Sequence, residues 1–277
     1  MLTEPRDLDR AELERLLERW WGLRDPTLDY LPVGFGSHHW RCDSRGTHSF
    51  VSVDDLEAGF QAGPDADAAF TALDRAFRTA ASLRDDAGLE FVVAPLADDD
   101  GLVLRRLSDR YAIRVSPLVE GDSSGFGAYE TPEDRRRMGA VLGRLHAATE
   151  HVPAGLPRRD DLELPSRCAL EEALHDLDRP WGSGPFGEPT RRLDWDTTLI
   201  APRERDLRMV LDDDLTGWSE YSAHAGAASF DQEALRLYRR SWDLADIGIF
   251  VAGFRQPHER TEDAAASWDS LADYLRS

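Results

Sequence analysis

The sequence predicts an α+β fold in which a mostly antiparallel β half is followed by a helical half. Three observations predict it. Short apolar or alternating segments separated by turn residues occupy residues 28–115, one strongly amphipathic segment interrupts them, and helical periodicity dominates after Pro117. We therefore expect two lobes, residues 1–117 and residues 118–277.

The first elements follow from the spacing of apolar residues. In residues 7–22 these recur every three to four positions, which predicts an amphipathic helix. Alternating or apolar segments predict a three-stranded meander over residues 30–35, 40–42 and 49–53. Residues 66–84 then place their large apolar side chains on one helical face, so we expect this helix to pack on the sheet.

Three further segments complete the β half. The apolar residues 89–95 predict a buried strand, and residues 102–107 with 111–115 predict a hairpin. We expect residues 28–115 to form one mostly antiparallel sheet, packed by the single helix 66–84.

The second half is predicted to be helical. Residues 117–121 mark a plausible hinge, and residues 179–190, rich in Gly and Pro, a loop. The expected helices are residues 132–149, 166–178, 230–254 and 261–275.

Composition restricts the classes of partner. The formal net charge is −20, and all 33 basic residues are arginine. This charge disfavours nucleic acid and anionic membranes, and it favours a small cationic molecule. No apolar run approaches the ~20 residues that span a bilayer. Cys42 and Cys168 have no metal or redox spacing, so we expect free thiols in the cytoplasm.

A glycine pair lies between two predicted strands. Gly34 and Gly36, followed by Ser37, would let backbone amides approach phosphate groups, although an ordinary tight turn has the same pattern. The adjoining His38 and His39 point to opposite faces of a strand, so we expect one packed and one exposed histidine.

Acidic residues mark a second candidate site. Asp194 and Asp196 share one face at the end of a predicted strand and could chelate one hard cation, or form a solvated acidic strand end. Asp206 stands at a helix start, where it could be only an N-cap. His146 continues a helical face and alone indicates a core or cap residue.

Taken together, these motifs resemble the aminoglycoside phosphotransferase and choline-kinase-like group of bilobal, protein-kinase-like proteins. The resemblance covers most of the chain and is closest to actinobacterial members similar to the spectinomycin phosphotransferases. It rests on residues 34–40 and 50–55, on the helix that ends Leu-His-Ala at Ala147, and on Leu-Asp-Trp-Asp at 193–196 followed by Glu-Arg-Asp-Leu at 204–207.

The resemblance implies ATP and Mg²⁺ as cofactors and assigns roles. The metal would lie on Asp194, with Asp196 beside it, and Asp206 would steady the catalytic loop. Residues that would cover the phosphates are Gly34, Gly36 and Ser37, and residues that would present backbone groups to adenine are Ser116 and Leu118.

The sequence also departs from that pattern. It contains neither lysine nor asparagine, and Ser52 stands where the family's phosphate-binding lysine is expected. The expected His-Gly-Asp loop is absent, because residues 184–191 run directly into Leu193, and several tens of residues of a shortened C-lobe are missing. Asp176 is a weak substitute for the lost base, since Trp181 stands where its Asn partner should be.

Three hypotheses follow. The leading one is a degenerate, non-catalytic member that retains nucleotide, metal or cationic-ligand binding. The second is an active small-molecule phosphotransferase, with Asp194 on magnesium and arginines such as Arg41 or Arg114 neutralising phosphates. The third is a decayed gene product. If the loop is lost, Asp206 should be exposed or pair with Arg192 or Arg205.

Overall fold

The computed structural model describes residues 3–33, 37–57, 65–119, 129, 131–159, 171, 175, 199–211, 214–227, 229–255 and 262–274. The chain divides into two compact units. The first consists mainly of Met1–Asp122, and the second mainly of Ser123–Glu150 and Leu199–Ser277.

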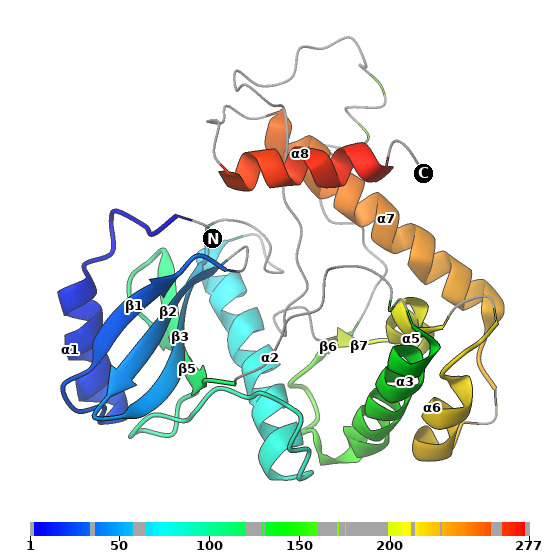
Figure 1. Cartoon of the computed structure of the whole chain (residues 1–277), viewed down its shortest axis with the longest axis horizontal. Helices are drawn as coiled ribbons and strands as arrows, with labels where there is room; N and C mark the ends of the chain where they lie inside the picture. The colour runs from blue at the N-terminus through cyan, green and yellow to red at the C-terminus, as the bar shows by residue number, and fades with distance from the viewer. Residues whose placement is uncertain are drawn as a thin grey trace. The chain divides into compact units, whose positions relative to one another are not determined.

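The first unit is built on a five-stranded antiparallel sheet with strand order β1-β2-β3-β5-β4 (Figure 1). Its strands are β1 Thr27–Leu31, β2 Ser37–Ser44, β3 Thr47–Asp55, β4 Arg105–Arg106 and β5 Tyr111–Pro117. A two-residue turn of Arg45 and Gly46, both with positive φ, connects β2 to β3, as the right-handed twist of a hairpin favours. The predicted meander and hairpin are confirmed, but the first strand begins earlier and ends earlier than the predicted residues 30–35, and β4 is shorter than the predicted residues 102–107.

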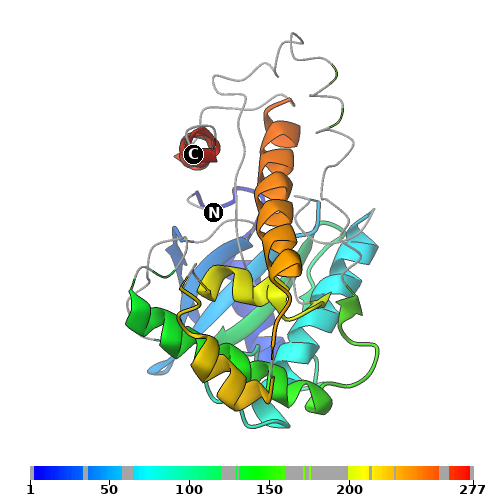
Figure 2. The same ribbon diagram turned by 90° about the vertical axis from the view of Figure 1, so that its right-hand side faces the viewer.

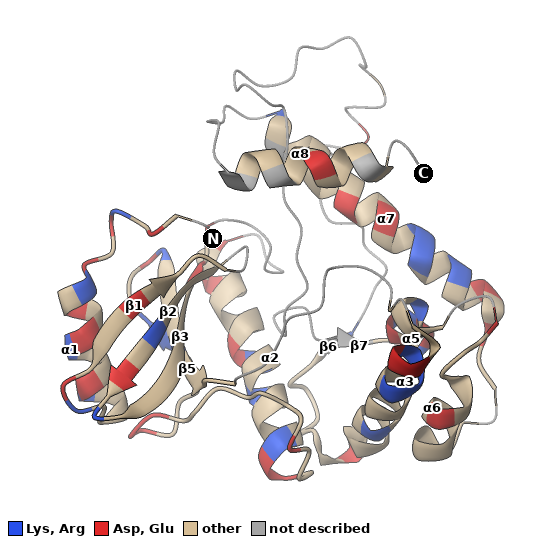
Figure 3. Cartoon of the chain, in the orientation of Figure 1, with Lys and Arg blue, Asp and Glu red and all other residues tan. Residues whose placement is uncertain are grey.

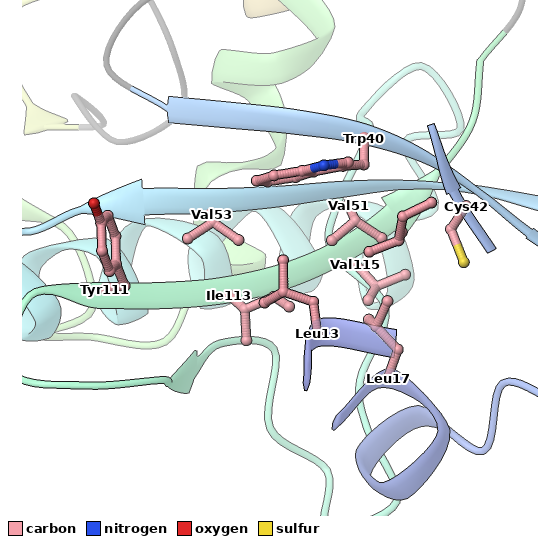
Figure 4. Close-up of a cluster of buried hydrophobic side chains, with 10 residues drawn as sticks. Leu13, Leu17, Trp40, Cys42, Val51, Val53, Tyr111, Ile113 and Val115 are labelled. Carbon is pink, nitrogen blue, oxygen red and sulfur yellow. The ribbon is translucent and has the colours of Figure 1, made fainter. Parts of the chain in front are cut away.

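One face of this sheet packs against helix α1, Arg10–Trp21, whose N-terminus is capped by Asp9. Figure 4 shows Leu13 and Leu17 of α1 lying against side chains from β2, β3 and β5. The buried sheet residues of this cluster are Trp40, Cys42, Val51, Val53, Tyr111, Ile113 and Val115. Alternate residues of each strand contribute, so the strand period of two determines which side chains enter this core.

Helix α2, Ala66–Asp85, is capped by Asp65 and contributes Ala69, Leu73 and Phe77 to a second buried cluster. This cluster contains Ala112, which lies between the inward-facing Tyr111 and Ile113 on β5, so α2 covers the opposite face of the sheet (Figure 2). The predicted helix 66–84 is confirmed, together with its packing on the sheet.

The predicted strand 89–95 is wrong. Leu89, Val92 and Ala94 are buried as expected, but the backbone of this segment forms no sheet ladder. Leu89 N–H instead donates to the carbonyl of Leu83 at the end of α2 (3.1 Å). The apolar run therefore indicated burial, and periodicity alone does not separate a buried strand from a buried irregular segment.

The second unit is mostly helical among its described residues. Its helices are α3 Pro132–Ala147, followed by the 3₁₀ turn Ala148–His151, and then α5 Glu204–Val210, α6 Trp218–Ala225, α7 Gln232–Phe254 and α8 Glu262–Tyr274. Strands β6, Arg158–Arg159, and β7, Leu199–Ile200, form a separate two-stranded sheet. Helix α3 packs on α6 and α5, α5 packs on α7, and α7 packs on α8.

Three of the four helices expected in this half are confirmed, as α3, α7 and α8. Helix α6 was not predicted, because its eight residues are too few to show a helical period. The helix expected at residues 166–178 and the loop expected at 179–190 lie outside the described residues, apart from two isolated positions. In the part of the chain that the structure describes, no helix is long and apolar enough to cross a membrane.

Two glycines allow α3 and α6 to approach at backbone distance. A Cβ atom added at Gly139 would lie 2.3 Å from the carbonyl oxygen of Gly217, and one at Gly143 would lie 2.6 Å from that of Tyr221. Real Cβ atoms do not come this close to backbone oxygens, so any larger residue must force the two helices apart. The spacing of four residues places both glycines on the same face of α3.

We predict that Gly143→Ala destabilises the second unit by about 1–3 kcal/mol, because the new methyl group overlaps backbone atoms. Alanine ordinarily stabilises a helix interior by about 1 kcal/mol relative to glycine, so the sign of the change is diagnostic. Urea unfolding followed by circular dichroism measures it. The control is Arg137→Ala, an exposed position of the same helix. An increase in the free energy of unfolding for Gly143→Ala would contradict the close contact.

Candidate functional site

A row of polar side chains crosses the α2-facing side of the sheet. In the strand register His39 of β2 lies opposite Ser52 of β3, and Ser52 lies opposite Arg114 of β5. All three are buried, with Ser52 only 1% exposed. The position at which the sequence lacks a lysine is therefore flanked on both sides by a basic residue.

His39 and Ser52 contact each other directly. The Nδ1 atom of His39 lies 3.0 Å from the Ser52 hydroxyl, and the imidazole stacks on Phe50 with ring centroids 4.9 Å apart. The Ser52 hydroxyl is thus committed to a hydrogen bond within the sheet.

Arg114 forms a buried ion pair with Asp54. Its guanidinium donates to Asp54 Oδ2, and the Ser37 hydroxyl donates to Asp54 Oδ1 at 2.6 Å. The guanidinium also lies over the ring of Phe77 on α2, 4.3 Å from its centroid. Asp54 is 1% exposed and Arg114 6% exposed, so the pair is held away from water. Buried charges need such partners, because desolvation of an unpaired charge is costly.

The expected nucleotide-binding residues are only partly described. Ser37 begins β2 and its hydroxyl is used by Asp54, while Ser116 is buried on β5, opposite Phe50. Leu118 follows β5 and is partly exposed. Gly34 and Gly36 lie outside the described residues.

The two adjacent histidines differ from expectation in one respect. They do point to opposite faces of β2, but both are buried, His38 at 7% and His39 at 5% exposure. His38 Nδ1 lies 3.2 Å from the Tyr30 hydroxyl, and burial lowers the pKa of His38. The expected exposed histidine is wrong because the second ring, that of His39, packs on Phe50 and pairs with Ser52 of the neighbouring strand.

In the second unit a histidine connects three helices. His146 near the end of α3 has Nδ1 2.7 Å from the Tyr221 hydroxyl of α6 and Nε2 3.0 Å from Asp206 Oδ2 of α5. The Nε2–H group of His146 donates to the carboxylate, and Nδ1 pairs with the tyrosine hydroxyl, so both ring nitrogens are used. His146 was expected to be only a core or cap residue.

Asp206 was expected to be exposed or paired with an arginine. Its side chain is 38% exposed, Arg205 lies 3.4 Å from Oδ1, and His146 is the nearer partner. Burial raises the pKa of Asp206, but the hydrogen bond and charge of His146, with the charges of Arg205 and Arg208, lower it by more, so the pKa lies below its ordinary value. Asp206 lies within the first turn of α5, three residues after the N-cap position Arg203.

The remaining candidates are not placed. Asp176, Asp194, Asp196 and Arg192 lie outside the described residues. Among the residues that are described, no group of three or more His, Cys, Asp or Glu side chains could hold a metal ion. Arg41 is described: it is half exposed, and its guanidinium lies 3.7 Å from Asp29.

Comparison with solved structures defines the fold. Spectinomycin phosphotransferase APH(9)-Ia in its AMP complex superposes with a TM-score of 0.65 at 15% identity, covering 98% of this chain and 96% of that one. Its complex with ADP and spectinomycin gives a TM-score of 0.64 at 15% identity, with 88% of each chain covered. A microcompartment-associated aminopropanol kinase gives 0.50 at 14% identity, covering 95% and 94%.

The chain has the aminoglycoside phosphotransferase fold. This confirms the predicted α+β, kinase-like architecture. No family model matches the sequence. A relative in sequence is protein StrN of Streptomyces griseus, 25% identical and covering 99% of this chain and 96% of StrN. That alignment runs over 340 positions, more than the 277 residues of this chain, so several tens of its positions have no residue of this chain opposite them.

Arg114 was expected from the sequence to neutralise phosphates in an active enzyme, but its partner Asp54 was not expected. Asp54 and Ser52 lie two residues apart, so they share a face of β3, and Arg114 interrupts an otherwise apolar stretch of β5. A charged residue within a buried strand of a phosphotransferase-like sheet requires an opposite charge on the same face. That requirement is the signal that could have identified Asp54.

We predict that Asp54→Ala destabilises the first unit by about 3–5 kcal/mol, because it leaves the Arg114 guanidinium buried without its carboxylate. Denaturant unfolding measures the change. The matched control is Asp29→Ala, which removes the exposed partner of Arg41 and should cost under about 1 kcal/mol. Similar losses for the two variants would contradict a buried pair.

We also predict that Asp206 contributes to the pH dependence of stability. Since its pKa is depressed in the folded chain, the contribution is complete above its ordinary value of 3.8 and is lost as the pH falls through the lower folded value. Asp206→Asn should reduce the fall in the free energy of unfolding between about pH 5 and about pH 2. The reduction should be about 1 kcal/mol or less, because the site is partly exposed. Asp269→Asn, at an exposed position of α8, is the control. An unchanged acid slope in Asp206→Asn would refute the assignment.

Proposed function

We propose that this chain is a nucleotide-binding protein of the phosphotransferase fold that does not transfer phosphoryl groups. The fold supports the general class, and nucleotide binding is supported by solved structures of the same fold that contain ADP and AMP. The loss of catalysis is inferred from the residues of this chain.

The observation that carries the proposal is the identity and burial of the residue at position 52. The strand position expected to hold the phosphate-binding lysine is occupied by a buried serine whose hydroxyl contacts His39. The sequence contains no lysine or asparagine at any other position. Phosphoryl transfer depends almost wholly on positioning and electrostatic stabilisation, so loss of these groups removes the main contributions of the protein.

The missing catalytic loop supports the same conclusion. Residues 184–191 run into Leu193 without the His-Gly-Asp sequence that the resemblance leads us to expect, and the alignment with StrN has several tens of positions that this chain lacks. Without that loop the reaction has neither its general base nor the asparagine ligand of a second metal ion. Asp176 remains the weak substitute.

We propose that Mg²⁺ binds weakly, on Asp194 and Asp196. Two carboxylates and water hold this ion poorly, because it retains its waters and usually takes ligands from substrate phosphates. We therefore expect binding only at millimolar Mg²⁺, strengthened little by ATP.

The second ligand we propose is a small cationic molecule. The net charge of −20 would attract it and would repel nucleic acid and anionic membranes. In the coloured cartoon of Figure 3, acidic residues and arginines occur together on α1, α3 and α7. We place the protein in the cytoplasm, in keeping with the free, buried Cys42.

An active phosphotransferase is the alternative. One observation favours it: Arg114 lies directly opposite Ser52 and brings a cation to the same face of the sheet. In that case Arg114 would neutralise phosphates and Asp194 would hold magnesium. Transfer activity distinguishes the two proposals.

We predict that ADP and ATP raise the melting temperature of the purified chain, because a ligand that binds only the folded state stabilises it. Raising Mg²⁺ to millimolar concentration should add little. Incubation with γ-labelled ATP should give no phosphorylation of spectinomycin, other aminoglycosides or choline above background.

The control is Asp194→Ala. Robust labelling of any of these acceptors that disappears in Asp194→Ala would establish the active alternative. A melting temperature unchanged by every nucleotide up to millimolar concentration would refute nucleotide binding, whatever the transfer assay shows.

A further inference from the structure

We infer that Arg114, with His39 on the other side of Ser52, binds the phosphates of the nucleotide in place of the absent strand lysine. This inference rests on the proposed nucleotide binding and names the residues that recognise the phosphates. It assigns a binding role only, since a buried cation does not replace the lost base of the catalytic loop.

The strand register places Arg114 within reach of the same space as a lysine at position 52. Ser52 and Arg114 are direct partners in the antiparallel pair of β3 and β5, and His39 is the direct partner of Ser52 on β2. The Cβ atoms of such partners lie about 4.5–5.5 Å apart and their side chains leave the same face. A guanidinium from β5 can therefore occupy the volume that a lysine of β3 would use.

The surroundings of Arg114 reproduce the electrostatics of such a lysine. In kinases the strand lysine is held by a carboxylate as it binds the phosphates. Here Asp54, two residues from Ser52 on the same strand, is ion-paired to Arg114, and Ser37 and Phe77 fix the carboxylate and the guanidinium. A charge held in a low-dielectric interior acts more strongly on a nearby phosphate than an exposed one.

The chemistry of the group fits the ligand. The guanidinium is always charged and presents its N–H donors in a planar fork that matches phosphate oxygens. Arg41, on β2 with His39, lies opposite Phe50 and beside Asp29 and is half exposed. It therefore lacks the buried ion pair of Arg114. It serves as the matched control.

The test compares ADP with adenosine, which differ only in the phosphates. Isothermal titration of the full chain should show ADP binding at least about tenfold more tightly than adenosine. In Arg114→Gln this preference should fall by on the order of tenfold, the size expected for a charge-assisted hydrogen bond, with adenosine affinity unchanged. His39→Gln should reduce the preference by a smaller factor, and Arg41→Gln should not change it.

Two further variants separate binding from folding. Arg114→Gln combined with Asp54→Asn removes both buried charges and leaves neither unpaired, so the chain should fold. It should nevertheless lack the preference for ADP. Ser52→Lys added to Arg114→Gln supplies a new cation to Asp54 from its own strand, β3, in place of the one lost from β5, and it should restore the preference.

Four results would overturn the inference. They are an equal loss of ADP and adenosine affinity in Arg114→Gln, an equal effect of Arg41→Gln, no rescue by Ser52→Lys, and equal affinities of the unaltered chain for adenosine and ADP. The last would leave nucleotide binding intact. Binding of neither ligand by the unaltered chain would overturn the proposed function as well.

Discussion

The buried Asp54–Arg114 ion pair is the constraint on which the first unit depends. Two opposite charges with almost no exposure can remain in a sheet only if they meet, and they meet only in the observed register of β3 and β5. A shift of one residue would turn Arg114 toward the apolar face that α1 covers. The same pair positions Ser37 at the start of β2 and Phe77 on α2, so it also aligns the neighbouring strand and the helix.

Most of the sheet could be predicted, because its strands and turns are determined by patterns of neighbouring residues. Alternation identified the meander, and Ser44-Arg45-Gly46 identified the turn in which Arg45 and Gly46 adopt positive φ. The strand predicted at residues 89–95 was wrong because its structure depends on contacts that are not local. The apolar composition of these residues reflects contacts with the end of α2, and whether a buried segment joins a ladder depends on its neighbours in space. Helix α6 was not predicted, because it is stabilised by packing on α3 and not by its own short sequence.

The candidate sites show the same difference between local motifs and contacts of residues distant in the sequence. The resemblance led to Ser52 and to Asp206, which are single positions within recognisable motifs. The pairs that form in the structure join residues far apart in the sequence, since Arg114 is 60 residues from Asp54 and His146 is 60 residues from Asp206, so no local motif shows them. Nor could the sequence show that His38 and His39 are both buried, since His38 meets Tyr30 and His39 meets Phe50 and Ser52 only in the folded sheet.

The backbone contact of α3 with α6 has a consequence for how the chain tolerates changes in length. Gly139 and Gly143 meet residues of α6 that follow in the sequence only after residues 160–198, so the contact does not depend on how many residues connect the two helices. The entropy lost on closing such a loop grows only with the logarithm of its length, and a shorter connection makes closure slightly easier. A helical core closed in this way can lose a long intervening segment, with the function it carried, and still fold.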